Sequence, residues 1–204
     1  RKFSLIQKDR EVIYVPNAPA RDTFSSLQCR VPVGELVVGY VGAFKGREGI
    51  RSLVQAAAAA REKGVDCKVL FAGVGLDQDL VSSYARDNGF VTYLGPYRHE
   101  QIKEIYSNVN VLYAVYNQTY DKKIHMPYRL SEGICCGLPI IATEGSHVGE
   151  IVKKAMIGVT VELGDVEQLA CILVEMCRTP EHLTRMSQNC EAIREQHAFE
   201  HYAG

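Results

Sequence analysis

The sequence predicts an α/β fold with an open, doubly wound parallel sheet of about six strands. From Glu35 onward, short apolar runs rich in β-branched residues alternate with amphipathic segments of about 10 to 15 residues, which is typical of βαβ units. The apolar runs contain few polar residues, as expected for strands that are buried on both faces. With 204 residues, the chain is long enough for a core that needs neither disulfides nor a metal.

Each expected strand is a short run of β-branched or aromatic residues that ends at or near a turn residue. The strands span residues 35–42, 67–73, 91–95, 110–116, 139–143 and 158–163. The expected helices are amphipathic, and the first contains the alanine run Ala56–Ala60, which strongly favours a helix. The helices span residues 50–63, 77–88, 100–107, 127–136, 148–154 and 166–178.

The two ends of the chain depart from this alternation. Residues 1–34 contain an extended VIYV segment, a Pro-Asn turn and a second proline, which is typical of a linker. Residues 35–178 form the expected domain, and Pro180 interrupts the pattern after it. Residues 181–201 predict one further, mostly polar helix with a sparse apolar face, so we expect the segment 179–204 to pack on an N-terminal domain outside this sequence. The abrupt opening at Arg1 also suggests a piece of a longer protein.

Composition excludes several classes of protein. A net charge of -1, from 23 basic and 24 acidic residues, gives no global reason to bind nucleic acid or an acidic membrane. The seven cysteines are odd in number and scattered, with no CxxC pair, which favours a reducing cytoplasm over a disulfide framework or a zinc site. His197 and His201 lack a further metal ligand nearby. No apolar run reaches the roughly 20 residues that cross a bilayer.

The most informative stretch is PYRLSEGICCGLPII, residues 127–141. Pro127 suits the first position of a helix, and Gly137 followed by Pro139 suits its end. Arg129 then lies at the positive end of the helix dipole, next to the basic run before Pro127, and a bound phosphate would relieve this crowding. Glu132 lies on the same helix face as Arg129 and could accept hydrogen bonds from both hydroxyls of a ribose.

An exposed ion pair between Arg129 and Glu132 is the alternative interpretation, and it would contribute only about 0.2 to 0.5 kcal/mol. The vicinal pair Cys135 and Cys136 falls inside the same helix and has no assigned role.

Loops rich in glycine follow several of the expected strands. Ligands of open α/β sheets bind at the carboxyl ends of the strands, where the strand order reverses. After the first strand, GAFKGREG places Lys45 and Arg47 within reach of a phosphate, and Gly42 allows close backbone approach. Gly73 and Gly75 follow the second strand, although glycines at such turns often serve only the turn.

Other ligand motifs are weak or absent. GVGLDQ lacks the third glycine of a dinucleotide fingerprint, and no GxxxxGK[ST] loop occurs, which argues against NAD and against a P-loop. Asp77 and Asp79 are interpreted as cap and first-turn charges of a helix rather than as a metal-diphosphate site. Tyr113, Tyr116 and Tyr120 either line the core or stack on a base or sugar.

The order of these motifs resembles a known family. The VPN linker, GYVG, VLFAGVG, VTYLGPY, IYSNVNVLYAVY, PYRLSEGICCGLPIIAT, GEIV and GVTVELGD are similar to the carboxyl-terminal half of a two-domain, retaining GT-B glycosyltransferase of group 1. The similarity covers residues 15–178. It implies a Rossmann-like domain, one half of a GT-B architecture, that holds a nucleoside diphosphate sugar, whereas the absent half holds the acceptor.

The resemblance also implies roles for single residues. Glu132 would bind the ribose, Lys45 and Arg47 the diphosphate, Tyr97 would approach the base, and His125 and Met126 would face the transferred sugar. The expected donor-binding set is Gly42, Lys45, Arg47, Gly73, Gly75, Tyr97, His125, Met126, Pro127, Arg129, Leu130 and Glu132.

Three positions depart from the family pattern. Ile124 stands where many members carry the first of two glutamates, Ala43 replaces an arginine, and Glu48 replaces a lysine. Arg129 could take over part of the phosphate-binding role.

The implied activity is the transfer of a hexosyl-type group to an acceptor hydroxyl with retention, in polysaccharide or glycoconjugate synthesis. No metal or other cofactor is expected, because cations of the chain would stabilise the leaving diphosphate. No residue of this chain is an obvious catalytic base, so the isolated fragment should be inactive. The expected partners are the sugar nucleotide and, through the absent domain, a sugar or lipid-linked acceptor; that domain could also mediate peripheral membrane association.

Two other hypotheses stay open at this point. The altered basic positions could mark a catalytically degenerate domain that only binds a nucleotide sugar or docks a partner. A flavodoxin-like or receiver domain fits the number of βαβ units, but it gives no reason for PYRLSEG and needs acidic clusters at strand ends that the sequence lacks.

Overall fold

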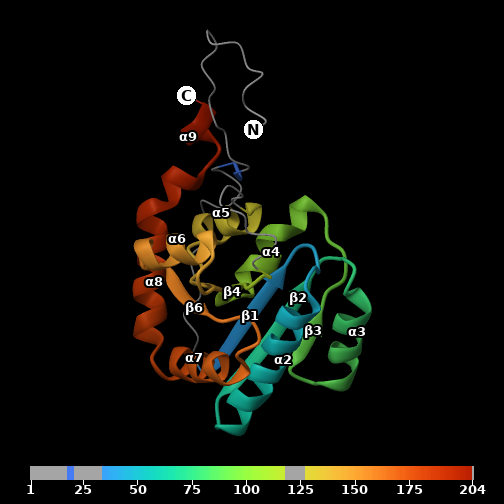
Figure 1. Ribbon diagram of the computed structural model, residues 1–204. Helices are drawn as coiled ribbons and strands as arrows, with labels where there is room; N and C mark the ends of the chain where they lie inside the picture. The colour runs from blue at the N-terminus through green and yellow to red at the C-terminus, as the bar shows by residue number, and fades with distance from the viewer. Residues whose placement is uncertain (1–17, 21–33, 118–126, 204) are drawn as a thin grey trace, which may run out of the picture.

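The computed structural model describes residues 18–20, 34–117 and 127–203. All strand pairs in it are parallel and join into one six-stranded sheet of order β3-β2-β1-β4-β5-β6, which confirms the predicted doubly wound α/β fold (Figure 1). The strands are β1 (Glu35–Val41), β2 (Asp66–Ala72), β3 (Val91–Tyr93), β4 (Val111–Ala114), β5 (Ile140–Thr143) and β6 (Gly158–Val161).

Helices cover both faces of this sheet. The α-helices are α2 (Arg47–Glu62), α3 (Gln78–Asp87), α4 (Ile102–Ser107), α5 (Tyr128–Cys135), α6 (His147–Ala155), α7 (Val166–Arg178), α8 (Pro180–Ile193) and α9 (Glu200–Ala203). Short 3-10 turns are η1 (His99–Gln101) and η3 (Arg194–His197). The expected helix at 100–107 therefore starts as a 3-10 turn and continues as α4.

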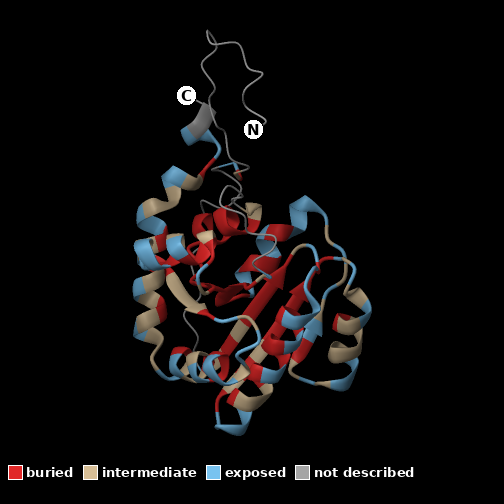
Figure 2. Ribbon diagram, in the orientation of Figure 1, coloured by how far each residue is buried: buried red, intermediate tan, exposed pale blue. Residues whose placement is uncertain are grey.

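Two hydrophobic layers enclose the sheet, as Figure 2 shows by the buried strands. Along β1, Leu36, Val38 and Tyr40 enter the layer with α2, α3 and α7, whereas Val41 enters the layer with α4, α5 and α6. This alternation follows from the two-residue period of a strand. Each fully buried side chain of this size contributes about 1.5 to 3 kcal/mol, so the apolar strands fix the sheet.

The strand order reverses between β1 and β4. From β1 the chain moves outward to β2 and β3, and β4 then returns to the other side of β1, where Val38 pairs with Val111. Loops that follow adjacent strands diverge at such a point and leave a crevice at the carboxyl edge of the sheet. The fold therefore places the loops after β1 and β4, and the start of α5, around one opening.

Helix α5 begins and ends through its prolines and glycine. Pro127 is the N-cap, with extended backbone angles of φ -62 and ψ 132, so the expectation that it occupies the first helical position is wrong by one residue. At the other end, Gly137 adopts φ 69, and the amides of Gly137 and Leu138 donate to the carbonyls of Ile134 and Gly133 at 3.0 and 2.9 Å. These two bonds form a Schellman motif, which confirms the expected stop.

The C-terminal segment differs from the single helix expected over residues 181–201. It consists of α8, η3 and α9, because the helical hydrogen bonding changes after Ile193. α8 buries Leu183, Ser187 and Cys190 against the domain itself, and the Sγ of Cys190 lies 3.4 Å from the carbonyl oxygen of Leu138. The sparse apolar face thus already has a partner within this chain, and packing on an N-terminal domain stays a prediction.

Among the described helices, none has the length and apolar character of a membrane span.

Candidate functional site

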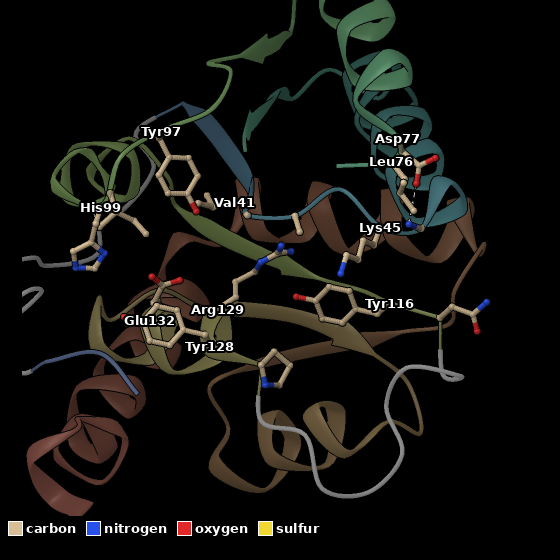
Figure 3. A pocket seen from close by; sticks show the side chains of 16 residues that line it. Val41, Lys45, Leu76, Asp77, Tyr97, His99, Tyr116, Tyr128, Arg129 and Glu132 are labelled. Atoms are coloured by element: carbon tan, nitrogen blue, oxygen red, sulfur yellow. Dashed lines mark hydrogen bonds between the residues drawn. The ribbon is translucent and has the colours of Figure 1, made fainter. Parts of the chain in front are cut away.

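A cavity of about 710 Å³ opens at the carboxyl edge of the sheet, over the point where the strand order reverses. Its walls come from the loops after β1, β2, β3 and β4 and from the start of α5 (Figure 3). The lining residues are Val41, Gly42, Ala43, Lys45, Gly46, Leu76, Asp77, Tyr97, His99, Ile102, Tyr116, Asn117, Pro127, Tyr128, Arg129 and Glu132.

Helix α5 presents Arg129 and Glu132 to this cavity. Only 9% of Arg129 and 4% of Glu132 is exposed, and the two side chains do not form an ion pair with each other. The alternative of an exposed surface pair is therefore wrong. A buried cation and a buried carboxylate are both costly unless something pairs with them.

The guanidinium of Arg129 contacts two aromatic rings. Its Cζ is 4.4 Å from the ring centroid of Tyr40 and 5.4 Å from that of Tyr116, which fixes the planar group by cation–π contacts. Nη1 is buried and has no hydrogen-bond partner among the described residues. Gly42, with φ +115, lets the guanidinium approach the backbone, since a Cβ there would lie 2.8 Å from Nη2. The group is thus rigidly held with an unused donor.

The carboxyl of Glu132 is also only half satisfied. Its Oε2 accepts a hydrogen bond of 3.0 Å from the hydroxyl of Tyr106, while Oε1 is buried without a partner among the described residues. Burial raises the pKa of Glu132 to about 7, and the Tyr106 hydrogen bond and the charge of Arg129 limit that rise. Arg129 and Glu132 therefore both line the cavity, and each has one buried polar atom without a partner among the described residues.

The loop after β1 contributes Gly42 and Lys45 to the cavity wall, but not Arg47. Arg47 instead pairs with Asp77, with Nε 3.4 Å from Oδ1. The carboxylate of Asp77 makes no cap hydrogen bond to its own helix α3, so the expected capping role is wrong for this side chain.

Three further members of the expected set do not line the cavity. Leu130 is fully buried in the layer beneath α5. Gly73 and Gly75 lie under the loop after β1, where a Cβ would come within 2.0 Å of the Gly42 carbonyl and 2.3 Å of the Phe44 carbonyl, respectively. Glycine is required at both positions for this close packing of two loops.

The remaining expected residues divide in two groups. Tyr97 and Pro127 line the cavity, and Tyr97 sits near Glu132 at one end of it (Figure 3). His125 and Met126 lie outside the described residues. Of the tyrosine cluster, Tyr113 belongs to the core, where its hydroxyl donates to the Gly49 carbonyl at 3.1 Å, Tyr116 lines the cavity, and Tyr120 also lies outside the described part.

Several lining residues were missed by sequence reasoning. Leu76 lies at the rim of the cavity and is 89% exposed. The sequence signal for it is an apolar residue in a glycine-containing loop just after a strand. Asn117 follows the end of β4, whereas His99 and Tyr128 are the first residues of η1 and α5. Only these positions in the chain indicate that the three residues belong to the site. The cysteines of α5 contribute no donor to the wall: burial raises the pKa of the Cys135 thiol to about 11.

The six parallel strands, their order and the crevice at the reversal define a Rossmann-like domain, a fold that matches solved GT-B glycosyltransferases. Residues 35–179 match the family described as Glycosyl transferases group 1, and the chain belongs to that family. The resemblance to group 1 glycosyltransferases noted in the sequence is thereby confirmed, whereas retention stays a prediction.

Individual proteins are similar to this chain in sequence or in fold. The chain is 26% identical over 170 residues to the succinoglycan biosynthesis protein ExoL of Rhizobium meliloti (strain 1021), a match that covers 81% of this chain and 41% of that protein. Sucrose-phosphate synthase from Thermosynechococcus elongatus superposes with a TM-score of 0.70 at 24% identity, over 93% of this chain and 49% of that one. Anabaena HepE in complex with UDP-glucose superposes with a TM-score of 0.67 at 18% identity, over 82% and 46%. The chain thus spans about two fifths of the length of the curated relative.

Proposed function

We propose that the cavity binds a nucleoside diphosphate sugar and that this chain is the donor-binding half of a glycosyltransferase. The observation that carries the proposal is the pair Arg129 and Glu132, which both line the cavity, are both buried and each have one polar atom without a partner among the described residues. A diphosphate and a ribose supply what these two groups lack, namely anionic oxygens and a pair of hydroxyl donors. A cavity of about 710 Å³ also falls within the usual range for small-molecule sites.

The order of groups along the cavity suggests how the donor lies. Glu132 would accept the ribose hydroxyls, Tyr97 would approach the base, and the diphosphate would lie over Arg129 and Lys45 (Figure 3). The first amides of α5 add positive potential at the same place. Charge that builds up on the leaving diphosphate would therefore meet fixed donors, and a fixed donor of this kind contributes roughly 2.7 to 4 kcal/mol in the oxyanion hole of a protease.

The whole reaction needs more than this chain. We propose transfer to an acceptor hydroxyl with retention, in polysaccharide or glycoconjugate synthesis, with the acceptor and any peripheral membrane contact supplied by an N-terminal domain. The name of the related succinoglycan protein supports the polysaccharide class. A cytoplasmic location and the independence from a metal stay predictions.

Calorimetric titration of the chain with uridine, guanosine and adenosine diphosphates tests donor binding. We expect saturable heat with a preference for one base, and uridine diphosphate (UDP) is the first probe because a structural neighbour holds UDP-glucose. A degenerate domain is the second candidate, favoured by Ala43 and Glu48 at positions that are basic in the family. It predicts no selective binding to any of the three nucleotides.

Glycosyl transfer by the isolated chain is expected to be absent. The described cavity contains donor-binding groups, while the acceptor side is assigned to the N-terminal domain. Incubation of the chain with UDP-glucose and a panel of sugar acceptors, followed by mass spectrometry of the products, would detect transfer. A glycosylated product above the level of an enzyme-free control would contradict this part of the proposal.

A further inference from the structure

The loop after β1 is tied to the loop after β2 by backbone hydrogen bonds. The amide of Gly42 donates to the carbonyl of Ala72 at 2.8 Å, and the amide of Phe44 donates to that of Val74 at 2.9 Å. Phe44 and Gly75 form an isolated parallel bridge. Up to Phe44, the loop therefore has a fixed path along its neighbour.

These backbone hydrogen bonds end at Phe44, and the carboxylate of Asp77 holds the next part of the loop. Oδ2 of Asp77 accepts a hydrogen bond of 3.0 Å from the amide of Gly46, and Oδ1 pairs with Nε of Arg47 at 3.4 Å. Gly46 is held at φ 114, a left-handed conformation that favours glycine. The Asp77 side chain is only 14% exposed, so the contact is partly shielded from solvent. The two carboxylate oxygens of Asp77 thus bind Gly46 and Arg47, the two residues that follow Lys45.

These contacts of Asp77 bear on the direction of the Lys45 side chain. It points into the cavity on the side of Tyr116 and Arg129, and no carboxylate of the described residues forms an ion pair with it (Figure 3). A lysine on an untethered turn would lose several rotatable bonds of freedom on binding a phosphate, which weakens affinity. A turn that is already fixed avoids part of this loss.

We propose that Asp77 is a positioning residue that holds the Gly46–Arg47 turn and thereby aims Lys45 at the diphosphate. The inference rests on the proposed donor site and assigns Arg47 to the tether rather than to the phosphate. Asp77 lines the cavity, but the Gly46 amide and the Arg47 guanidinium occupy its two oxygens and offset its charge. It therefore acts through the loop and does not touch the donor.

A double-mutant cycle with Lys45 tests this role by UDP titration. Lys45→Ala is expected to weaken binding about tenfold, as for a lost hydrogen bond to a charged group. Asp77→Ala is expected to weaken it about three- to tenfold, which is the scale of one side chain that must be ordered on binding. In the Lys45→Ala background, Asp77→Ala should add less than about a twofold change. Mere loss of structure would weaken binding in both backgrounds.

Two further variants complete the test. Asp77→Asn keeps an acceptor for the Gly46 amide and serves if the alanine variant folds poorly; its loss should be smaller and should again vanish without Lys45. Asp79→Ala removes the exposed carboxylate of the first turn of α3 and should leave binding unchanged. The inference is wrong, while the donor site stands, if the wild-type chain binds UDP and the Asp77 variants bind it equally well. The same holds if the loss of affinity in the Asp77 variants adds fully to the loss in Lys45→Ala. If the wild-type chain binds none of the three diphosphates, both fail.

Discussion

Replacing Arg129 with methionine is expected to weaken UDP binding by roughly one to two orders of magnitude, which is the scale of lost hydrogen bonds to a charged group. Methionine keeps a flexible, unbranched side chain in place but removes the guanidinium that lies over the Tyr40 ring with Nη1 unpaired. Calorimetric titration of the wild-type and variant chains measures the change.

The stability of the unliganded chain should change in the opposite direction. Burying a cation that forms no ion pair and leaves Nη1 without a partner among the described residues costs several kcal/mol, and the two ring contacts return only about 0.5 to 2 kcal/mol each. Arg129→Met should therefore raise the free energy of unfolding by about 1 kcal/mol. Weaker UDP binding together with greater stability of the unliganded chain would indicate that Arg129 is buried to bind a ligand and does not stabilise the fold.

Two other arginine variants bracket this result. Arg129→Lys keeps the charge but loses the planar fork that stacks on Tyr40, so its affinity should lie between those of the wild type and Arg129→Met. Arg51→Met removes an exposed arginine of α2 outside the cavity and should leave UDP binding unchanged. An Arg129→Met chain with wild-type affinity would contradict the phosphate-binding role, and a large loss of stability would show that Arg129 serves the fold.

The fold could be predicted because its signals are local. The strand at residues 35–42 is almost entirely apolar, since β1 has packed helices on both faces, and the Gly137 stop of α5 follows from backbone chemistry alone. The break of the last helix after Ile193 could not be predicted in this way. It depends on how α8 packs on α5 and α7, and tertiary contacts of this kind leave no local signature.

The site was predictable where one helix carries two groups at a fixed spacing. Arg129 and Glu132 are three residues apart on α5, so their common face followed from helical geometry. The loops were less predictable, because their side chains depend on partners distant in sequence. The position of Arg47 predicts a phosphate contact, yet Arg47 pairs with Asp77, thirty residues later, and does not line the cavity.

The affinity of the chain for UDP is expected to rise between about pH 6 and pH 8, because Glu132 titrates there. Burial raises the pKa of Glu132 to about 7, whereas the Tyr106 hydrogen bond and the charge of Arg129 lower it. Four weakly acidic groups also lie near it, namely the hydroxyls of Tyr97 and Tyr128 and the thiols of Cys135 and Cys136; their pKa values are all raised, so these four stay neutral in this range. Only the ionised carboxylate can accept hydrogen bonds from both ribose hydroxyls with full strength.

Calorimetry of wild-type and Glu132→Gln chains at several pH values isolates this effect. The phosphate of UDP also titrates, but it does so equally for both proteins, and their difference reports Glu132. At pH 8 the glutamine variant should bind about tenfold more weakly, since it loses charge-assisted hydrogen bonds, and the gap should narrow toward pH 6. An equal affinity at pH 8 would remove the ribose role from Glu132.

The same pKa shift predicts the sign of a change in stability without a ligand. The carboxyl of Glu132 binds its proton more tightly in the folded chain, with a pKa of about 7 against the usual 4.5, so the folded state holds more protons between these values. The free energy of unfolding should therefore fall as the pH rises from about 5 to 8, by up to about 3 kcal/mol from this group. Urea unfolding of Glu132→Gln should lack this part of the pH dependence, while Glu104→Gln, an exposed change on α4, should retain it. Saturating UDP should reduce the fall in the wild type, because the ligand pairs the carboxylate that burial leaves unpaired.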